Sequence, residues 1–445
     1  MGSGRTDPRG GWAGRGSALL IAFLLVGCAS RPAPPPADPD ASPAREDPRS
    51  QGPIPLVRVG IAPDVSLAVL SADGAWAVGI MGRAGSAEAI PAGASLRFHA
   101  RGGSLHLDGL GTTRAIGSDT LYAYPKDRGS TRLSVGSTRY RGEMLVFASG
   151  EDRLTVVNVV DLESYLRGVV PAEIGRSGPE RIEAVKAQAV AARTYTLANM
   201  SRWRSRGFDL LATVADQVYL GADGERADVD EAVRATTGVV ALHEGRPILA
   251  YYSSTCGGIT AGPETVWGKQ ARPYLKARRC RARRGADSFC APSPYYRWIE
   301  VWDGPVLETI LKRTLPGATG EGDPESWGRL VDLEIEKRSN DKRVEELEIR
   351  FEKRRITIGG DAIRWVLRRP DGGSLRSALL LEIQVEEKEG RANRVAVRGA
   401  GFGHGVGLCQ YGAIGMARAG VDYLQILRFY YRGVRLVRAY RAWPA

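Results

Sequence analysis

The chain has 445 residues, of which 43% are hydrophobic and 25% charged, so wholesale disorder is excluded and two or three globular domains are expected. The 62 Lys and Arg outnumber the 50 Asp and Glu, and the net charge of +12 favours an acidic partner without identifying it. Five cysteines are too few for a fold built on disulfides, and four histidines argue against an extended multi-histidine metal centre.

The N-terminal segment predicts export. Three arginines precede the apolar run 18–26, which is about half the ~20 residues of a membrane-spanning helix, so residues 1–27 are predicted to be a signal peptide. Gly27-Cys28 follows this run and resembles a bacterial lipobox, which implies cleavage before Cys28 and lipidation of its thiol. The alternative is a plain signal peptide with an incidental cysteine. A lipid would anchor the chain in the envelope, at the periplasmic face of the outer membrane if the cell has one and otherwise at the outer face of the cell membrane.

The composition after Cys28 predicts an α+β protein in several parts. Residues 28–55 are rich in proline and form a tether, since they contain almost nothing apolar to bury. Short alternating strands separated by glycine-rich turns then predict a small β domain at 56–139. The remaining parts are a mixed α/β domain at 140–435, a charged insertion or subdomain within it at about 300–390, and a tail at 436–445.

The second domain begins with a buried strand at 154–160 and a short helix that Asp161 is placed to cap. A loop at 168–175 is expected next, and it contains Glu173. The strongest helix signal covers 179–200, with Pro179 in its first turn and a small apolar stripe. Farther on, 344–351 alternates as a strand and 359–367 is expected to be helical.

Glycines alternate with side chains from 399 to 407. In an extended segment this spacing leaves one face without side chains, where a ligand or a second backbone can approach closely. It never gives G-x-G-x-x-G, so a dinucleotide site is rejected. Two helices are expected after this segment, at 410–419 and around 424–430.

Three sequence blocks, at 158–195, 251–275 and 403–413, together resemble the SpoIID/LytB family of stage II sporulation protein D and amidase-enhancer proteins. They occur in the family's order and span about 140–435, and the resemblance implies that this domain has a glycan-binding cleft. The resemblance implies a lytic transglycosylase that cleaves MurNAc–GlcNAc bonds of peptidoglycan strands stripped of stem peptides and leaves anhydro-MurNAc ends. It also implies an N-acetylmuramoyl-L-alanine amidase as partner, and Glu173 as the catalytic acid.

The chemistry is compatible with one carboxyl group. Hydrolytic glycosidases use two carboxylates, whereas a lytic transglycosylase can protonate the leaving oxygen and then deprotonate the sugar's own 6-hydroxyl with the same group. Such an acid must stay protonated near neutrality, which requires an apolar setting that raises its pKa. Glu163 is a competing carboxylate that is expected to cap or pair, and Asp216 is a second candidate for lining the groove.

Removal of stem peptides frees a lactyl carboxylate on each MurNAc, so the substrate is an acidic polymer. Lys186 and Arg193 lie seven residues apart on one helix face and are expected to bind these carboxylates. The other residues expected in substrate binding are Tyr195, Ser254, His404, Gln410 and Tyr411. His404 has a structural hydrogen-bonding role as its alternative.

Four cysteines remain beyond Cys28, and an even number in an oxidising space suggests bridges, with Cys256–Cys290 as the favoured pair. Some clostridial members of the family bind zinc through one His and two Cys near this motif. Tyr252 stands where that His is expected, so that site does not carry over, and no metal or cofactor is expected. Zinc held by Cys256, Cys290 and Cys409 is the minority alternative.

Two further functions stay open: an amidase enhancer that holds glycan without cleaving it, and a structural lipoprotein that links membrane to wall. Nucleic acid is disfavoured as a partner, because the basic run 278–284 has no aromatic residues interleaved for stacking.

Overall fold

The computed structural model describes residues 45–46, 52–83, 85–109, 111–117 and 120–440. The predicted signal peptide, Cys28 and most of the predicted tether therefore lie outside the described residues. Among the helices of the described ranges, none combines the length and the apolarity that a membrane span requires. The fold mixes helices and sheets, so the predicted α+β class is confirmed.

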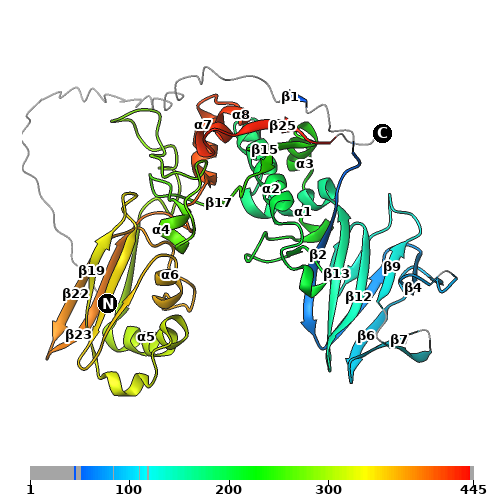
Figure 1. The fold of residues 1–445 in the computed structure, drawn as a ribbon, viewed down its shortest axis with the longest axis horizontal. Coiled ribbons are helices and arrows are strands. Elements are labelled where there is room, and N and C mark those ends of the chain that lie inside the picture. Colours follow the sequence, from blue (N-terminus) through cyan, green and yellow to red (C-terminus); the bar gives the residue numbers. More distant parts are fainter. Residues whose placement is uncertain (1–44, 47–51, 84, 110, 118–119, 441–445) are drawn as a thin grey trace, which may run out of the picture. The chain divides into compact units, whose positions relative to one another are not determined.

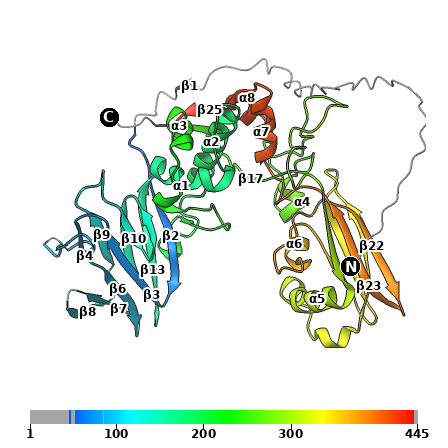
Figure 2. The same ribbon diagram turned by 180° about the vertical axis from the view of Figure 1, so that it is seen from behind.

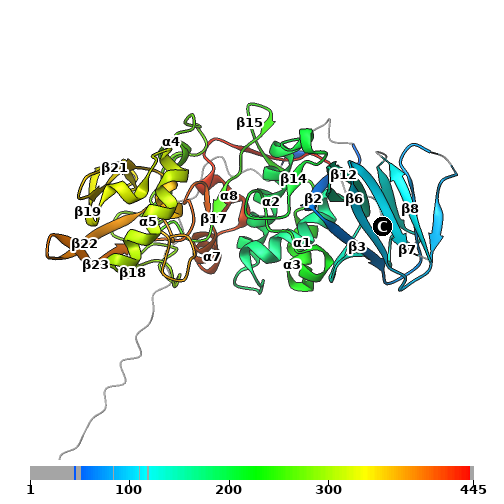
Figure 3. The same cartoon turned by 90° about the horizontal axis from the view of Figure 1, so that it is seen from below.

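The N-terminal part consists of two antiparallel sheets, whose strands lie together in Figures 1 and 3. One has six strands in the order β11-β10-β3-β6-β7-β8. The other has seven, in the order β14-β2-β13-β12-β9-β4-β5, and only β14 pairs in parallel. The strands are β2 Leu56–Val65, β3 Leu67–Ala72, β4 Trp76–Ile80, β5 Glu88–Ile90, β6 Leu96–Arg101, β7 Ser104–Gly109, β8 Thr112–Gly117, β9 Leu121–Pro125, β10 Leu133–Val135, β11 Thr138–Tyr140, β12 Glu143–Gly150, β13 Arg153–Asp161 and β14 Leu210–Leu211.

Five helices belong with these sheets, and Figures 1 and 2 show three of them, α1 to α3, beyond the end of β2 and β13. The helices are α1 Leu162–Ile174, α2 Ile182–Asn199, α3 Ala227–Ala235, α7 Gln410–Arg418 and α8 Tyr423–Tyr430. One hydrophobic core includes buried residues of both sheets and of all five helices. The strand β2, at the start of the predicted β domain, pairs with β13, so the sheet continues across residue 140 into the strand that leads to α1.

Short strands complete this part of the chain. They are β1 Arg45–Glu46, β15 Val239–His243, β16 Arg246–Pro247, β17 Tyr252–Ser253, β24 Leu408–Cys409 and β25 Arg435–Arg438. The parallel pair β17 and β24 brings the second and third sequence blocks together. Of the residues predicted as a tail, 436–438 instead belong to β25, and the Tyr440 hydroxyl lies 2.6 Å from Glu163 Oε1.

The predicted insertion at about 300–390 has a hydrophobic core of its own, which runs from Trp298 to Val397. Two three-stranded antiparallel sheets surround this core, and α5 packs against β18 and β23 (Figure 3). The elements are β18 Trp298–Asp303, α5 Gly304–Thr319, β19 Leu330–Arg338, β20 Val344–Phe351, β21 Arg355–Ile358, α6 Ala362–Val366, β22 Leu380–Lys388 and β23 Arg391–Gly399. We refer to residues 298–399 as the inserted lobe.

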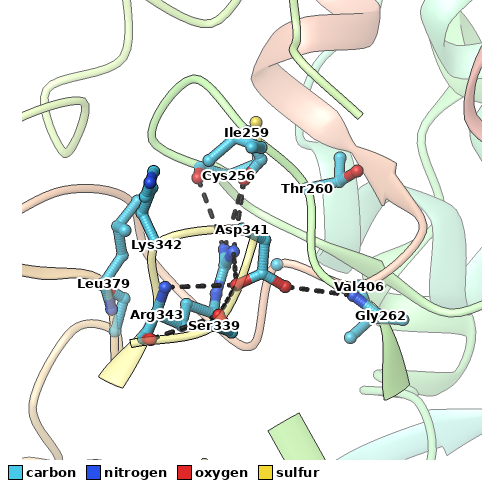
Figure 4. A network of polar contacts seen from close by, with 12 residues as sticks. Cys256, Ile259, Thr260, Gly262, Ser339, Asp341, Lys342, Arg343, Leu379 and Val406 are labelled. Atoms are coloured by element: carbon cyan, nitrogen blue, oxygen red, sulfur yellow. Dashed lines mark hydrogen bonds and ion pairs between the residues drawn. The ribbon is translucent and has the colours of Figure 1, made fainter. Parts of the chain in front are cut away.

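The turn between β19 and β20 attaches the inserted lobe to the second sequence block (Figure 4). Asp341 and Arg343 are both about 2% exposed, and Asp341 Oδ2 accepts a hydrogen bond from the Gly262 N–H at 3.4 Å. The Arg343 guanidinium donates to the carbonyls of Ile259, at 3.4 Å, and of Cys256, at 3.5 Å. This buried polar contact fixes the loop that follows β17.

Two predicted helix boundaries were wrong. The helix that Asp161 caps does not end before a loop, because it continues through Val169 and Val170, which are fully buried, to Ile174. The second helix begins at Ile182 rather than at Pro179, which precedes it.

The glycine row at 399–407 is not an extended strand. Gly401, Gly403, Gly405 and Gly407 have φ between 75° and 97°, a region that favours glycine. A Cβ on Gly407 would lie 2.0 Å from the Tyr251 carbonyl oxygen. Of the two expected neighbours, a ligand or a second backbone, the second is therefore present: the glycines let this segment pass against the chain around β17.

Candidate active site

Glu173 lies in the last turn of α1. The helix forms because the Asp161 side chain accepts a hydrogen bond from the Ser164 N–H at 2.9 Å, and because its apolar side is buried in the core. It ends at Gly175, where φ is 76° and the N–H donates to the Pro171 carbonyl at 3.0 Å. This end presents the half-buried Glu173 side chain to the residues after α2 and to the start of α7.

Three donors surround the Glu173 carboxyl group. The Val218 N–H donates to Oε1 at 3.1 Å, and the side chains of Tyr252 and Gln410 also hydrogen-bond to the group. Gln217 orients Tyr252, since its Nε2 donates to the Tyr252 hydroxyl oxygen at 2.9 Å. The hydroxyl hydrogen of Tyr252 is then available to Glu173. The carboxyl group therefore has a fixed orientation.

Burial raises the pKa of Glu173 above its usual value, and this effect outweighs the three hydrogen bonds, which lower it. The position on α1 acts in the same direction as burial, because the C-terminal end of a helix carries partial negative charge and disfavours a carboxylate. Glu173 therefore keeps its proton to higher pH than an exposed glutamate does. This is the property that a general acid needs.

A cleft of about 470 Å³ opens beside Glu173. Its lining combines this acid with hydrogen-bonding groups, two arginines and a few apolar side chains. The residues are Glu173, Ile174, Arg181, Ser254, Pro292, Gln410, Tyr411, Ile414 and Arg418. Such a mixture suits a ligand that carries hydroxyls and negative charge.

The raised pKa of Glu173 predicts a pH-dependent cost to stability. At a pH between the unfolded pKa of about 4.3 and the raised folded pKa, Glu173 is protonated in the native state and ionised in the unfolded chain. Its contribution to the free energy of unfolding is therefore complete below the unfolded pKa and is lost as the pH rises through the folded pKa. Glu173→Gln removes the titration. Thermal melts are expected to show that the stability of the variant relative to the wild type increases as the pH rises above the unfolded value of about 4.3.

The exposed Glu231→Gln on α3 is the matched control for these melts. A difference between Glu173→Gln and the wild type that stays constant with pH, or that moves in the opposite direction, would contradict the raised pKa.

Comparison with known proteins shows which family contains chains similar to this one. The family model described as stage II sporulation protein (SpoIID) matches residues 150–243, which include α1, α2 and Glu173, and a domain of unknown function (DUF8618) matches 281–407. An uncharacterized protein of Brachyspira hyodysenteriae is 31% identical over 312 residues, which cover 68% of this chain and 74% of that protein. The chain belongs to the SpoIID/LytB family.

Two relatives from Bacillus subtilis give the breadth of the SpoIID/LytB family. Its stage II sporulation protein D is 27% identical over 300 residues, which cover 64% of this chain and 76% of that protein. Its amidase enhancer is 27% identical over 291 residues, which cover 61% of this chain and 40% of the enhancer.

Four of the predicted site residues of this SpoIID/LytB chain line one cleft. Glu173, from the first sequence block, meets Ser254 from the second and Gln410 and Tyr411 from the third. The Tyr411 N–H donates to the Ser254 carbonyl at 3.0 Å, and Gln410 Nε2 lies 3.4 Å from Gln188 Oε1 on α2. The loop after β17, α1 and α7 therefore build the cleft together.

The prediction that Lys186 and Arg193 form a substrate-binding cationic face on α2 was wrong. The Arg193 side chain is fully buried and forms a two-pronged ion pair with Glu163, with Nε–Oε1 at 2.8 Å and Nη2–Oε2 at 2.7 Å. Lys186 points elsewhere: its Nζ lies 2.6 Å from Glu183 Oε1 and 6.0 Å from the ring centre of Tyr423. Neither side chain lines the cleft. The expectation that Glu163 pairs is met.

Tyr195 and His404 also lie outside the cleft lining. The Tyr195 hydroxyl donates to Asp216 at 3.2 Å, and the Asp216 side chain is itself fully buried, so this carboxylate lines no groove. His404 contacts the rings of Trp267 and Tyr251, and its Nδ1 accepts the Val406 N–H at 3.0 Å. Burial lowers the pKa of His404 to about 4, which leaves it neutral and suits the structural alternative.

Three residues of the site were missed by sequence reasoning. Arg181 and Arg418 line the cleft, and Tyr252 binds Glu173. Arg181 Nη2 donates to the Ile174 carbonyl at 2.9 Å, and Arg418 pairs with Glu180 at 2.8 Å. Arg418 is eight residues after Gln410 on α7, so helical spacing could have placed both on one face.

The cysteines beyond Cys28 are all buried and unbridged. The structure does not contain the favoured Cys256–Cys290 bridge: the two sulfurs lie 3.7 Å apart, whereas a disulfide bond is about 2.05 Å long.

Proposed function

We propose that this chain is a peptidoglycan lytic transglycosylase that cleaves MurNAc–GlcNAc bonds in glycan strands free of stem peptides. The observation that carries the proposal is a half-buried glutamate, with its pKa raised by burial, at the edge of a polar cleft that also contains two arginines. Membership of the family that includes stage II sporulation protein D supports it.

In the first step, Glu173 gives its proton to the glycosidic oxygen as the bond to C1 of MurNAc breaks. The resulting oxocarbenium ion at C1 is attacked by the 6-hydroxyl oxygen of the same sugar. The Glu173 carboxylate takes the hydroxyl proton, which closes the 1,6-anhydro ring and restores the acid. Because the nucleophile belongs to the substrate, the reaction needs no second carboxylate and no positioned water. Tyr252 and the Val218 N–H orient the carboxyl group and stabilise its anionic form between the two steps.

The charge of the cleft suits a stripped strand. Each MurNAc without its stem peptide carries a lactyl carboxylate, and Arg181 and Arg418 are the cationic side chains of the cleft lining. We assign to them the substrate-binding role that the sequence had given to Lys186 and Arg193. Peptide-bearing strands lack these free carboxylates and are expected to bind more weakly.

Arg418→Gln is expected to raise KM for stripped glycan about fivefold, the equivalent of one exposed charge contact of about 1 kcal/mol, with little change in kcat. The increase should shrink at high salt, because salt screens exposed charges. Arg398→Gln on the inserted lobe is the matched control, since Arg398 pairs with Glu382 at 2.9 Å, close to the 2.8 Å of Arg418 and Glu180. Equal KM values for both variants would show that Arg418 does not bind the substrate.

The direct test is to incubate the purified chain with amidase-treated glycan and to analyse the products by mass spectrometry. Fragments ending in anhydro-MurNAc are expected, with none from untreated peptidoglycan. Fragments with ordinary reducing ends would show that the chain is a hydrolase instead. Strands that stay intact would show that the chain does not cleave glycan and can only bind it.

The amidase-enhancer relative favours a second candidate function, a glycan-binding protein that stimulates an N-acetylmuramoyl-L-alanine amidase. Adding the chain to such an amidase and measuring the release of stem peptides distinguishes the two. Stimulation that survives in Glu173→Gln, without strand cleavage by the wild type, identifies an enhancer.

We also propose that the chain acts in the cell envelope, anchored through lipid on Cys28. The lipobox-like Gly27-Cys28 after the apolar run supports this location. Metabolic labelling with a fatty acid is expected to mark the wild type and to leave Cys28→Ser unlabelled.

A further inference from the structure

Four cysteines from distant parts of the chain meet in one place. Cys256 follows β17, Cys280 and Cys290 belong to the segment before the inserted lobe, and Cys409 is the N-cap of α7. All four side chains are fully buried, and their sulfur atoms lie within 4.8 Å of one another. Four unbridged thiols at such distances form a ready set of metal ligands.

The spacing of the sulfurs fits a tetrahedral ion. Zinc–sulfur bonds of about 2.3 Å place neighbouring sulfurs of a tetrahedron about 3.8 Å apart. The Cys256 and Cys290 sulfurs are separated by 3.7 Å. An all-thiolate set of this geometry selects zinc over calcium or magnesium, which prefer oxygen ligands.

The surroundings of the cluster supply donors to sulfur. Cys409 Sγ accepts the N–H groups of Cys256, at 3.2 Å, and of Gly412, at 3.3 Å. The Tyr430 hydroxyl lies 3.2 Å from Cys280 Sγ, and the Ser288 hydroxyl lies 3.3 Å from Cys290 Sγ. Hydrogen bonds of this kind stabilise and orient metal-bound thiolates.

A buried cation completes these surroundings. Arg343 Nη2 lies 3.5 Å from the Cys256 carbonyl oxygen, and Arg343 Nε has no hydrogen-bond partner within the described part of the chain (Figure 4). Arg343 also pairs with the buried carboxylate of Asp341, with Nη1–Oδ1 at 3.8 Å, so only part of its charge is left to offset the net charge of −2 on zinc with four thiolates.

We propose that Cys256, Cys280, Cys290 and Cys409 bind one structural zinc ion. Four protein ligands close the coordination sphere and leave no position for water, so the ion has no place in the cleavage chemistry. Binding converts the four thiols to thiolates and releases their protons to solvent. The set contains no histidine: Tyr252, which stands where the histidine ligand of some clostridial members is expected, hydrogen-bonds to Glu173 instead.

The ion would position the cleft. Three lining residues are close neighbours of three ligands in the sequence: Ser254 precedes Cys256 by two residues, Pro292 follows Cys290 by two, and Gln410 follows Cys409 directly. Zinc coordination would thus fix the relative positions of the segments that face Glu173. The metal site does not depend on whether the cleft is catalytic.

The test uses the full chain with Cys28→Ser, which leaves four cysteines. One zinc per chain is expected by elemental analysis, with the thiols unreactive until a chelator and a denaturant are added. Replacement by Co²⁺ should give the intense visible absorption of a tetrahedral cobalt–thiolate centre. Oxidised glutathione should form bridges only in chelator-treated protein.

Cys280→Ser is expected to weaken zinc binding by more than the roughly 10–100-fold typical of losing an outer-shell partner. Ser288→Ala is the matched control, since it touches Cys290 Sγ without being a ligand, and it should retain one zinc per chain. If Cys280→Ser does not fold, the cobalt spectrum of the four-cysteine chain decides alone. Substoichiometric metal with freely reactive thiols, disulfides in the isolated protein, or weak octahedral cobalt bands would overturn the proposal.

Discussion

Replacing Glu173 by glutamine is expected to lower the rate of glycan cleavage by roughly 10²–10⁴-fold, the usual contribution of general acid–base catalysis. The amide has nearly the shape of the acid, and its oxygen can still accept the Val218 N–H, so the fold and the cleft should persist. It cannot release a proton to the glycosidic oxygen or take one from the 6-hydroxyl. The loss should therefore appear in kcat, with KM for stripped glycan almost unchanged.

The measurement is the initial rate of formation of anhydro-ended fragments, with the thermal melt of each variant as a check of folding. Glu231→Gln, on the exposed side of α3, should keep the wild-type rate. Because the acid form of Glu173 is the active one at the start of the reaction, the wild-type rate should fall as the pH rises through its raised pKa. Unimpaired turnover in Glu173→Gln would exclude this residue as the acid and would leave a protein that binds glycan.

Arg193→Met is expected to cost about 3–5 kcal/mol in the free energy of unfolding, because it leaves a buried carboxylate without its cation. Arg193 joins three elements: it pairs with Glu163 on α1 and donates to the carbonyls of Val233, at 3.4 Å, and Val239, at 3.2 Å. The same carboxylate also accepts the Tyr440 hydroxyl at 2.6 Å. Urea unfolding at neutral pH measures the cost.

A double-mutant cycle with Glu163→Gln tests the origin of this effect, and the double variant should be more stable than Arg193→Met alone. Burial would raise the pKa of Glu163, but the charge and hydrogen bonds of Arg193, together with the hydrogen bonds from Tyr440 and the Gly238 N–H, outweigh burial and lower it. The stability from the pair is thus present above the unfolded pKa and is lost as the pH falls through the lowered one. A stable Arg193→Met with weak glycan binding would restore the substrate-binding role that the sequence had suggested.

The sequence predicts local structure well where one residue acts on its own neighbours. Asp161 caps α1 as expected, and the apolar stripe of α2 identifies a helix with an error of three residues at its start. The prediction for Glu173 was wrong in one respect: a loop was expected at 168–175, yet burial of Val169 and Val170 against the core keeps this segment helical to Ile174.

The sequence is weaker where the answer depends on what packs against an element. Helical spacing places Lys186 and Arg193 on one face but does not show that Glu163 from another helix covers Arg193. Arg181 belongs to no motif, so only the fold brings it to Glu173, whereas helical spacing from Gln410 could have indicated Arg418. The proximity of Cys256 and Cys280 is likewise a property of the fold, because the number of cysteines shows whether all of them can pair but not how far apart they lie.

The order of the cleft residues along the chain has a consequence for biosynthesis. Glu173 is made early, Ser254 precedes the inserted lobe, and Gln410 and Arg418 follow it. Contacts between such distant residues form late, because closing long loops is entropically costly and slow. A nascent or truncated chain that ends within the lobe therefore contains Glu173 but lacks one wall of the cleft, so the complete site forms only after the third sequence block has been made.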